Sequence, residues 1–322
     1  MSGSDGRRVL VLGATGTIGR AVVGELLAQG AHVTCLLRSA SGHGLPETAK
    51  TRLVDLSDPA SISAALGPDR FDALISCIAS RTGAPEDAWA VDHRANLNAL
   101  SAAGEAGVGH FILLSAICVQ KPLLAFQHAK LAFEAELKSS GLTWSIVRPT
   151  AYFKSISGQL DRLRQGKPFL LFGDGELTAC KPISDGDLAR YLVGCLDDPE
   201  RQNRILPVGG PGPALTPLDQ GRALFRALDL EPKFRRVPVA MMDAIIGVLS
   251  LAGRVSKTAA AKAELARIGR YYATESMLVW DAAAGRYDAE ATPSFGSETL
   301  PEFYARLVRG DVAIERGDHA VF

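Results

Sequence analysis

Apolar residues in the first half of this chain gather in short runs, separated by longer segments of helical periodicity. The runs lie at residues 9–12, 31–37, 51–56, 71–77, 110–115 and 143–148. Continuous apolar runs, rather than alternating ones, are typical of parallel strands that helices cover on both faces. Residues 59–66, 91–103 and 124–139, between the runs, are predicted as helices. This order predicts an α/β fold with a doubly wound parallel sheet.

The pattern changes in the second half, where glycine, proline and aromatic residues become frequent. Ser184 is placed there to cap a helix, and residues 205–208 form one more apolar run. We therefore expect a first domain over residues 1–155 and a smaller C-terminal lobe over residues 156–322, with about 180–210 returning to the sheet.

The first apolar run ends in a glycine-rich turn that opens an amphipathic segment. Strand, turn and helix follow one another in this way where a dinucleotide pyrophosphate binds at a helix N-terminus. Gly13 would permit the turn, Gly16 the approach of the phosphate, and Gly19 the packing of helix on sheet. The G-x-x-G-x-x-G spacing is looser than G-x-G-x-x-G, so an ordinary turn of another α/β protein is the alternative. We predict a Rossmann-type cofactor site that includes Gly13, Thr15, Gly16, Thr17, Ile18 and Gly19.

Arg38, at the end of the second run, bears on the choice of cofactor. An acidic residue there would bind the ribose 2′-hydroxyl of NAD, whereas arginine favours the 2′-phosphate of NADP. No carboxylate follows before Glu47. We therefore predict NADPH as the cofactor of the first domain, and a solvated charge at a strand end is the alternative for Arg38.

Residues at the carboxyl ends of the next strands are expected to line the same cofactor. Asp55 would contact the adenine amino group or serve as a turn residue. The segment after the fourth run would pass beneath the cofactor, and Ser115 ends the fifth run. The further cofactor contacts that we predict are Asp55, Leu56, Ile78, Ala79 and Ser115.

Charge and cysteine content limit the classes of binding partner and the cellular compartment that we expect for this protein. The 322 residues include 35 Lys and Arg and 35 Asp and Glu, so no net charge favours nucleic acid. The five cysteines are scattered, which is typical of reduced thiols and not of a metal cluster. Residues 1–8 lack the apolar core of a signal peptide. We expect a bacterial, cytoplasmic protein without a metal site of its own.

About a dozen residues after Ser115, Phe126-Gln127-His128-Ala129-Lys130 opens the next predicted helix. This arrangement resembles the short-chain dehydrogenase/reductase superfamily, whose members carry a serine on that strand and Y-x-x-x-K on that helix. Phe126 takes the place of the tyrosine, while the lysine is present as Lys130. The chain is therefore similar to the atypical members of the superfamily, which are NmrA-like or isoflavone-reductase-like.

Among these, the chain resembles the NADPH-dependent reductases of chlorophyll and bacteriochlorophyll biosynthesis that convert the 8-vinyl group of divinyl chlorophyllide a to ethyl. The segments that carry the resemblance are residues 148–155, 173–175, 179–184, 215–217, 269–279 and 292–296. The resemblance implies a magnesium tetrapyrrole substrate bound by the C-terminal lobe. The magnesium of the substrate is the only metal it implies.

Lys130 and Tyr152 are the predicted catalytic residues. Lys130 would orient the nicotinamide ribose and belong to the proton path, since a lysine beside an apolar ligand can have its pKa lowered enough to donate. Binding the ribose alone is the alternative for Lys130. Tyr152 would donate the proton at the pocket mouth or simply pack there. His128, two residues before Lys130, is expected to point elsewhere on the helix.

Residues 237–252 form the longest apolar stretch, which is too short to span a bilayer and is interrupted by Asp243. Within it, residues 241–246 would line a flat substrate pocket, contact a membrane surface peripherally, or form an ordinary core helix.

Two other functions stay open on the sequence. One is a related reductase of a small aromatic or enone substrate, and the other is a non-catalytic NADP-binding sensor or assembly factor, for which Phe126 argues. The sequence does not indicate an oligomeric state.

Overall fold

The structure is a computed structural model that describes residues 6–40 and 44–312. The first five residues, on which the expectation about a leader partly rests, and the last ten residues of the predicted C-terminal lobe lie outside these ranges.

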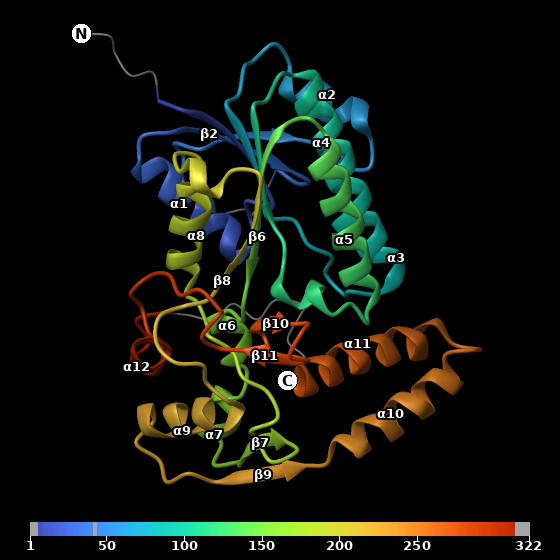
Figure 1. The fold of residues 1–322 in the computed structure, drawn as a ribbon, viewed down its shortest axis with the longest axis vertical. Helices are drawn as coiled ribbons and strands as arrows, with labels where there is room; N and C mark the ends of the chain where they lie inside the picture. Colours follow the sequence, from blue (N-terminus) through green and yellow to red (C-terminus); the bar gives the residue numbers. More distant parts are fainter. Residues whose placement is uncertain (1–5, 41–43, 313–322) are drawn as a thin grey trace.

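A seven-stranded sheet forms the centre of the molecule, and all of its strand pairs are parallel (Figure 1). Its strands are β1 (Arg8–Leu12), β2 (His32–Leu37), β3 (Lys50–Leu53), β4 (Ala73–Ser76), β5 (His110–Leu114), β6 (Thr143–Pro149) and β8 (Arg204–Val208). The order is β3-β2-β1-β4-β5-β6-β8, so the direction of winding reverses between β1 and β4. The predicted α/β class and doubly wound parallel sheet are confirmed.

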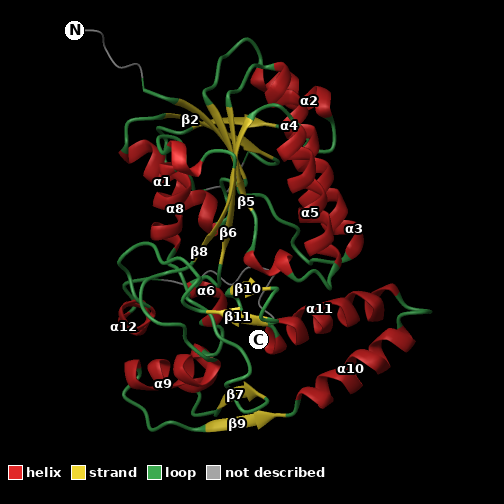
Figure 2. Cartoon of the chain, in the orientation of Figure 1, coloured by secondary structure: helices red, strands yellow, loops and turns green. Residues whose placement is uncertain are grey.

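Helices cover both faces of this sheet, as Figure 2 shows. On one face lie α1 (Thr17–Ala28) and α8 (Asp185–Gly194), and on the other lie α2 (Pro59–Leu66), α4 (Asn96–Glu105) and α5 (Ala125–Ser139). Each face has its own buried apolar core. The Asp58 carboxylate accepts a hydrogen bond from the Ala60 N–H at the start of α2, and the Ser184 hydroxyl accepts one from the Asp187 N–H in α8.

Two elements differ from the sequence-based expectation. The strand expected over residues 51–56 ends at Leu53, because the Asp55 carboxylate accepts hydrogen bonds from the Ser57 N–H and hydroxyl and so closes a turn. The helix expected over residues 91–103 begins earlier, at α3 (Pro85–Ala88), and continues through a π-helical segment, Trp89–Ala95, into α4. Such π segments are frequent at functional sites.

The rest of the chain forms a smaller region below the carboxyl edge of the sheet in Figure 1. Its elements are α6 (Phe153–Ile156), α7 (Leu160–Arg164), β7 (Phe169–Phe172), α9 (Pro217–Ala227), β9 (Phe234–Val237), β10 (Val279–Asp281), β11 (Arg286–Asp288) and α12 (Leu300–Arg309). A separate apolar core that includes Phe153, Leu224 and Tyr304 holds part of it together. Residues 185–208 supply α8 and β8 to the large sheet layer, and the domain limits themselves stay a prediction.

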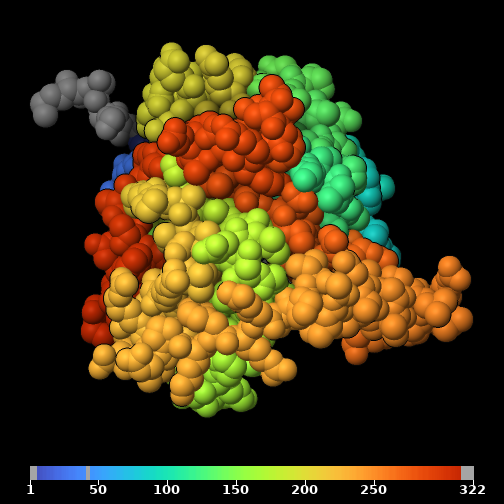
Figure 3. All heavy atoms as spheres, turned by 60° about the horizontal axis from the view of Figure 1, so that its bottom comes forward, coloured from blue at the N-terminus to red at the C-terminus, as the bar shows by residue number. Residues whose placement is uncertain are grey.

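A helical hairpin of α10 (Val239–Ala252) and α11 (Lys257–Thr274) projects from this smaller region, as Figures 1 and 3 show. In the described part of the chain, none of the helices combines the length and the apolar character that a bilayer crossing requires.

Candidate functional site

The glycine-rich turn after β1 has a geometry that only glycine allows at two of its positions. Gly13 has φ of +74°, and a Cβ atom there would lie 2.7 Å from the carbonyl of Cys77. A Cβ atom on Gly19 would lie 2.0 Å from the Gly13 oxygen. The turn is closed by the Gly16 N–H, which donates to the Gly13 oxygen at 3.0 Å. The first and third glycines are therefore required by packing within the protein itself.

Gly16 differs from the other two glycines, because there is room for a side chain at its position. A Cβ atom there would lie 3.4 Å from its nearest neighbour, the Gly13 oxygen. Gly16 is the N-cap of α1, makes no side-chain capping bond, and is followed by no acidic residue in the first turn. Uncapped N–H groups and the positive end of the helix dipole make such a terminus a binding site for anions. These residues fit the pyrophosphate of a dinucleotide.

A lysine from the smaller region reaches this turn. The Nζ atom of Lys154, in α6, donates to Thr17 Oγ1 at 2.8 Å. A cation is thereby held at the helix N-terminus, although sequence reasoning gave Lys154 no role. Of the other predicted turn residues, Thr15 is exposed, and Ile18 is buried in the core beneath the sheet.

The residues predicted to bind the adenosine half lie on the β2 and β3 side of the turn. Arg38 is exposed directly after β2. The hydrogen bonds from Ser57 lower the pKa of the Asp55 carboxyl, so Asp55 has the turn role that was its alternative. Leu56 packs against the core, Ile78 is buried after β4, and Ala79 is exposed.

Ser115, at the end of β5, is directed into the protein. Its hydroxyl donates to Glu134 Oε1 at 2.6 Å, and Glu134 is also paired with Arg148. Ser115 is 3% exposed. Its side chain therefore anchors α5 to the sheet. Because the hydroxyl is used in this way, it does not support the predicted contact of Ser115 with the cofactor.

Lys130 lies in a buried ion pair that sequence reasoning did not anticipate. Its Nζ atom is 2.9 Å from Asp92 Oδ1, and the two side chains are 10% and 0% exposed. The same carboxylate oxygen accepts the Ser80 N–H at 3.3 Å. Asp92 belongs to the π-helical segment, and its other oxygen, Oδ2, is buried without a hydrogen-bond partner. The one sequence signal for this ion pair was the position of Asp92, an acidic residue on the apolar side of the helix predicted over residues 91–103.

Tyr152 follows β6 and is half-buried against the core beside Cys77. Burial raises the pKa of its phenol, and the neighbouring Cys77, Asp185 and Cys118 groups raise it further. Asp185 begins α8; burial raises the pKa of its carboxyl to about 6 against the opposing charge of Lys154. The Tyr152 phenol is therefore protonated at neutral pH, and its raised pKa makes it a weaker acid than a solvent-exposed tyrosine.

A second phenol, Tyr272, comes from α11. Tyr272 is 43% exposed, and its phenol lies close enough to the Cys118 thiol and to Tyr152 to interact with them electrostatically. Burial of the hydroxyl and these neighbours raise the pKa of its phenol well above 10. Phe126, which occupies the position of the superfamily tyrosine, is instead 9% exposed in an apolar cluster with Ile268 and Tyr271. His128 is exposed, away from Lys130.

The structure thus orders the predicted residues along one edge of the sheet. Arg38 lies on the β2 side, the glycine turn at the switch between β1 and β4, and Lys130 and Tyr152 on the β5 and β6 side. This is the edge at which doubly wound sheets bind dinucleotides.

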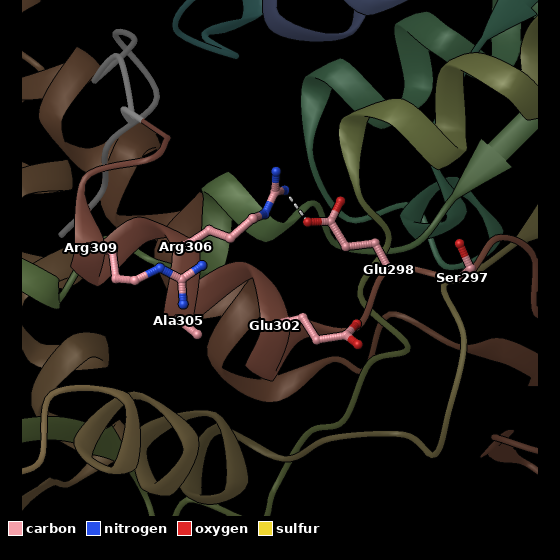
Figure 4. Close-up of a pocket in the computed structure, with 6 residues that line it drawn as sticks. All are labelled: Ser297, Glu298, Glu302, Ala305, Arg306 and Arg309. Atoms are coloured by element: carbon pink, nitrogen blue, oxygen red, sulfur yellow. Dashed lines mark hydrogen bonds and ion pairs between the residues drawn. The ribbon is translucent and has the colours of Figure 1, made fainter.

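A surface pocket of about 580 Å³ lies on α12 (Figure 4). Its lining includes an ion pair between Arg306 and Glu298, and none of the predicted site residues.

Comparison with known proteins places this geometry in context. A family model described as NAD(P)H-binding matches residues 13–199. The chain is 48% identical over 98% of its length to the chloroplastic divinyl chlorophyllide a 8-vinyl-reductase of Zea mays, of which it covers 82%. It is 26% identical over 63% of its length to the photosystem II assembly factor Ycf39 of Synechocystis, of which it covers 62%. The NADPH complex of the quinone oxidoreductase QOR2 of Escherichia coli shares the fold, with a TM-score of 0.67, 17% identity, and coverage of 93% of this chain and 99% of that one.

Proposed function

The chain belongs to the divinyl chlorophyllide a 8-vinyl-reductase family, within the NAD(P)H-binding proteins, and from that membership we propose its reaction and the residues that carry it. It reduces the 8-vinyl group of divinyl chlorophyllide a to an ethyl group, with NADPH as the reductant. The observation that carries this function is the 48% identity, because it extends over 98% of the chain and so includes the region outside the dinucleotide fold.

The cofactor site that we propose runs along the carboxyl edge of the sheet. The N-terminus of α1, with Gly16 and Thr17, holds the pyrophosphate, and Lys154 adds a positive charge beside it. Arg38 binds the 2′-phosphate of NADPH, which is supported by its exposed position after β2. When bound, NADPH supplies the hydride that the vinyl group accepts.

Lys130 is proposed to orient the nicotinamide ribose, with Asp92 as the positioning residue that holds it. The buried carboxylate fixes the ammonium group at 2.9 Å, so the lysine side chain has one preferred geometry. Donation of the catalytic proton by Lys130 itself stays a prediction, and the ion pair supports the orienting role instead.

Tyr152 is proposed as the proton donor. Addition of hydride to the terminal vinyl carbon leaves negative charge that spreads into the conjugated macrocycle, and a proton must then reach the inner carbon. The Tyr152 side chain packs against the same core as Cys77, which follows β4, and its phenol carries a proton that it can give to the substrate. Tyr272 is proposed to line the same site and position the substrate beside it.

One assay tests the reaction. Purified protein with NADPH and divinyl chlorophyllide a should shift the Soret band of the pigment to the blue, because the vinyl group leaves the conjugated system. A chain that binds NADPH and produces no shift would be a non-catalytic NADP-binding protein, and turnover of a small enone alone would indicate the related reductase.

The pigment is the partner that the family membership supports. A peripheral contact with a lipid surface is a further proposal, because α10 exposes its apolar residues. No nucleic-acid partner is proposed for a chain with no net charge. The bacterial cytoplasm stays a prediction.

A further inference from the structure

Helix α10 has an exposed apolar face along its whole length. It contains no buried residue, and Met241, Ile245, Val248 and Leu251 are 49%, 46%, 71% and 64% exposed. Their spacing places them along one side of the helix. Val255, 92% exposed, continues this side past the end of the helix. We call these five residues the α10 stripe.

The opposite side of α10 is held by α11, which fixes the direction of the stripe. Asp243 forms an ion pair with Arg270, and the Ser250 hydroxyl accepts a hydrogen bond from Arg267 at 2.8 Å. Both arginines belong to α11. The stripe therefore faces away from α11. Its apolar residues are explained neither by burial in a core nor by packing against the other helix of the hairpin.

Basic residues lie at both ends of the stripe. Arg235 and Arg236 precede α10 in β9, while Arg254 and Lys257 lie at the tip of the hairpin, and all four are exposed. Within residues 6–40 and 44–312, no ion pair involves any of these four. The acidic residue within α10, Asp243, is already paired with Arg270. The face therefore combines an apolar centre with free positive charge at each end.

We propose that the α10 stripe lies in the surface of an anionic phospholipid bilayer, with Arg254 and Lys257 at one end and one of the two β9 arginines at the other end on the lipid phosphates. Apolar side chains at the acyl boundary and cations at the headgroups are the two contributions that hold an interfacial helix. At 14 residues, α10 is about 21 Å long, which suits a helix that lies in the interface and not one that crosses it. This inference rests on the proposed function, because that function supplies the substrate. The substrate is an apolar pigment, and a reductase bound at the bilayer surface would meet it in the membrane.

Charge argues against a second copy of this chain as the occupant. A two-fold contact through the stripe would place the basic end of one α10 against a basic end of the other, whether the helices ran parallel or antiparallel. Such like-charge contacts destabilise an interface. An anionic lipid surface satisfies both ends at once.

The test uses the full chain and vesicles, without NADPH or pigment, so that it is independent of the reaction. Wild-type protein should co-sediment with vesicles of equal parts phosphatidylglycerol and phosphatidylcholine, and weakly with phosphatidylcholine alone. Ile245→Glu combined with Val248→Glu should lower the partition coefficient by about tenfold or more, since each buried side chain contributes on the order of one decade. Ile205→Glu combined with Leu53→Glu, which adds the same two charges at residues that are 38% and 58% exposed in β8 and β3, should not change it.

The basic ends are tested separately. Arg254→Glu combined with Lys257→Glu should weaken binding to the anionic vesicles and flatten its dependence on salt. Circular dichroism and a melting curve check that each variant is folded, and turnover of detergent-dispersed pigment should be the same as in wild type.

Three results would overturn the proposal. The first is equal binding by wild type and the Ile245/Val248 variant, or none by either. The second is a wild-type dimer in sedimentation velocity that the same variant dissolves, which would assign the stripe to a second copy. The third is loss of turnover on dispersed pigment by a folded variant, which would assign it to the substrate pocket. Failure of the Soret assay with intact vesicle binding would instead refute only the proposed reaction.

Discussion

Lys130 and Asp92 form an ion pair inside the protein, with Nζ 2.9 Å from Oδ1 and the carboxylate side chain fully buried. Removing two charges from water is costly, so a buried pair of this kind is weak evidence for a purely stabilising role. Asp92 Oδ2 has no hydrogen-bond partner, which adds to that cost. The arrangement is better explained by a lysine that must be held in one place at the cofactor.

Asp92→Asn should lower kcat/KM by about 10- to 100-fold, because the amide keeps the shape of the side chain and releases the ammonium group from its charged partner. Lys130→Met, which removes the group itself, should abolish turnover. Steady-state kinetics and NADPH binding followed by fluorescence measure both.

Glu86→Gln, an exposed carboxylate in α3, is the control for Asp92→Asn and should leave the kinetics unchanged. A merely structural role for Asp92 would lower the melting temperature and leave kcat/KM of the folded fraction intact. Turnover by Lys130→Met at the wild-type rate would remove the lysine from the mechanism.

Tyr152→Phe should lower kcat by about 10²- to 10⁴-fold with little change in NADPH affinity, since the variant lacks the proton that the reaction consumes. Single-turnover kinetics measure this step. Tyr272→Phe should act mainly on KM for the pigment, and Tyr191→Phe, in α8 against Phe295, should have no effect. A large loss of kcat in Tyr272→Phe with an active Tyr152→Phe would transfer the donor role to Tyr272.

Arg38→Ala should raise KM for NADPH by about tenfold or more and leave KM for NADH unchanged, because a charge-assisted bond to a phosphate contributes about 1.5–3 kcal/mol. Arg70→Ala, another exposed arginine just before β4, serves as the control. If Arg38→Ala affected the two cofactors alike, the arginine would be a solvated charge at a strand end.

Asp185 should make the protein less stable as the pH rises from about 4 to about 6. Burial raises the pKa of its carboxyl from 3.8 to about 6, so the folded chain holds this proton where the unfolded chain has released it. The stabilising effect of that proton is complete below about pH 4 and is lost as the pH passes about 6. Asp185→Asn should therefore be more stable than wild type at pH 7.5, by at most about 3 kcal/mol, and equally stable at pH 4.

Urea denaturation at the two pH values measures this difference. Glu176→Gln, an exposed carboxylate, provides the comparison. A variant Asp185→Asn that is no more stable than wild type at pH 7.5 would mean that Lys154 offsets the burial of Asp185 completely.

Much of the fold was predictable because its signals are local. The continuous apolar runs mark parallel strands, and the Asp58 and Ser184 caps mark helix starts, because strand burial and capping depend on residues close together in the chain. The glycine turn belongs to the same class, since Gly13 and Gly19 are required by contacts within a single strand–turn–helix unit. Arg38 and Lys130 could be named from their places after a strand and within a helix.

The partners of these residues depend on the tertiary structure alone. Asp92 reaches Lys130 from another helix, Lys154 reaches Thr17 from the smaller region, and Tyr272 reaches Cys118 from α11. No periodicity or spacing encodes such contacts, because they depend on how elements far apart in the chain pack against each other. The sequence by itself determined the sheet, the turn and the residue types at its carboxyl edge. Packing decided that the side chain of Phe126, at the superfamily tyrosine position, is buried. It also decided that the phenols of Tyr152, Tyr271 and Tyr272 gather near Cys118.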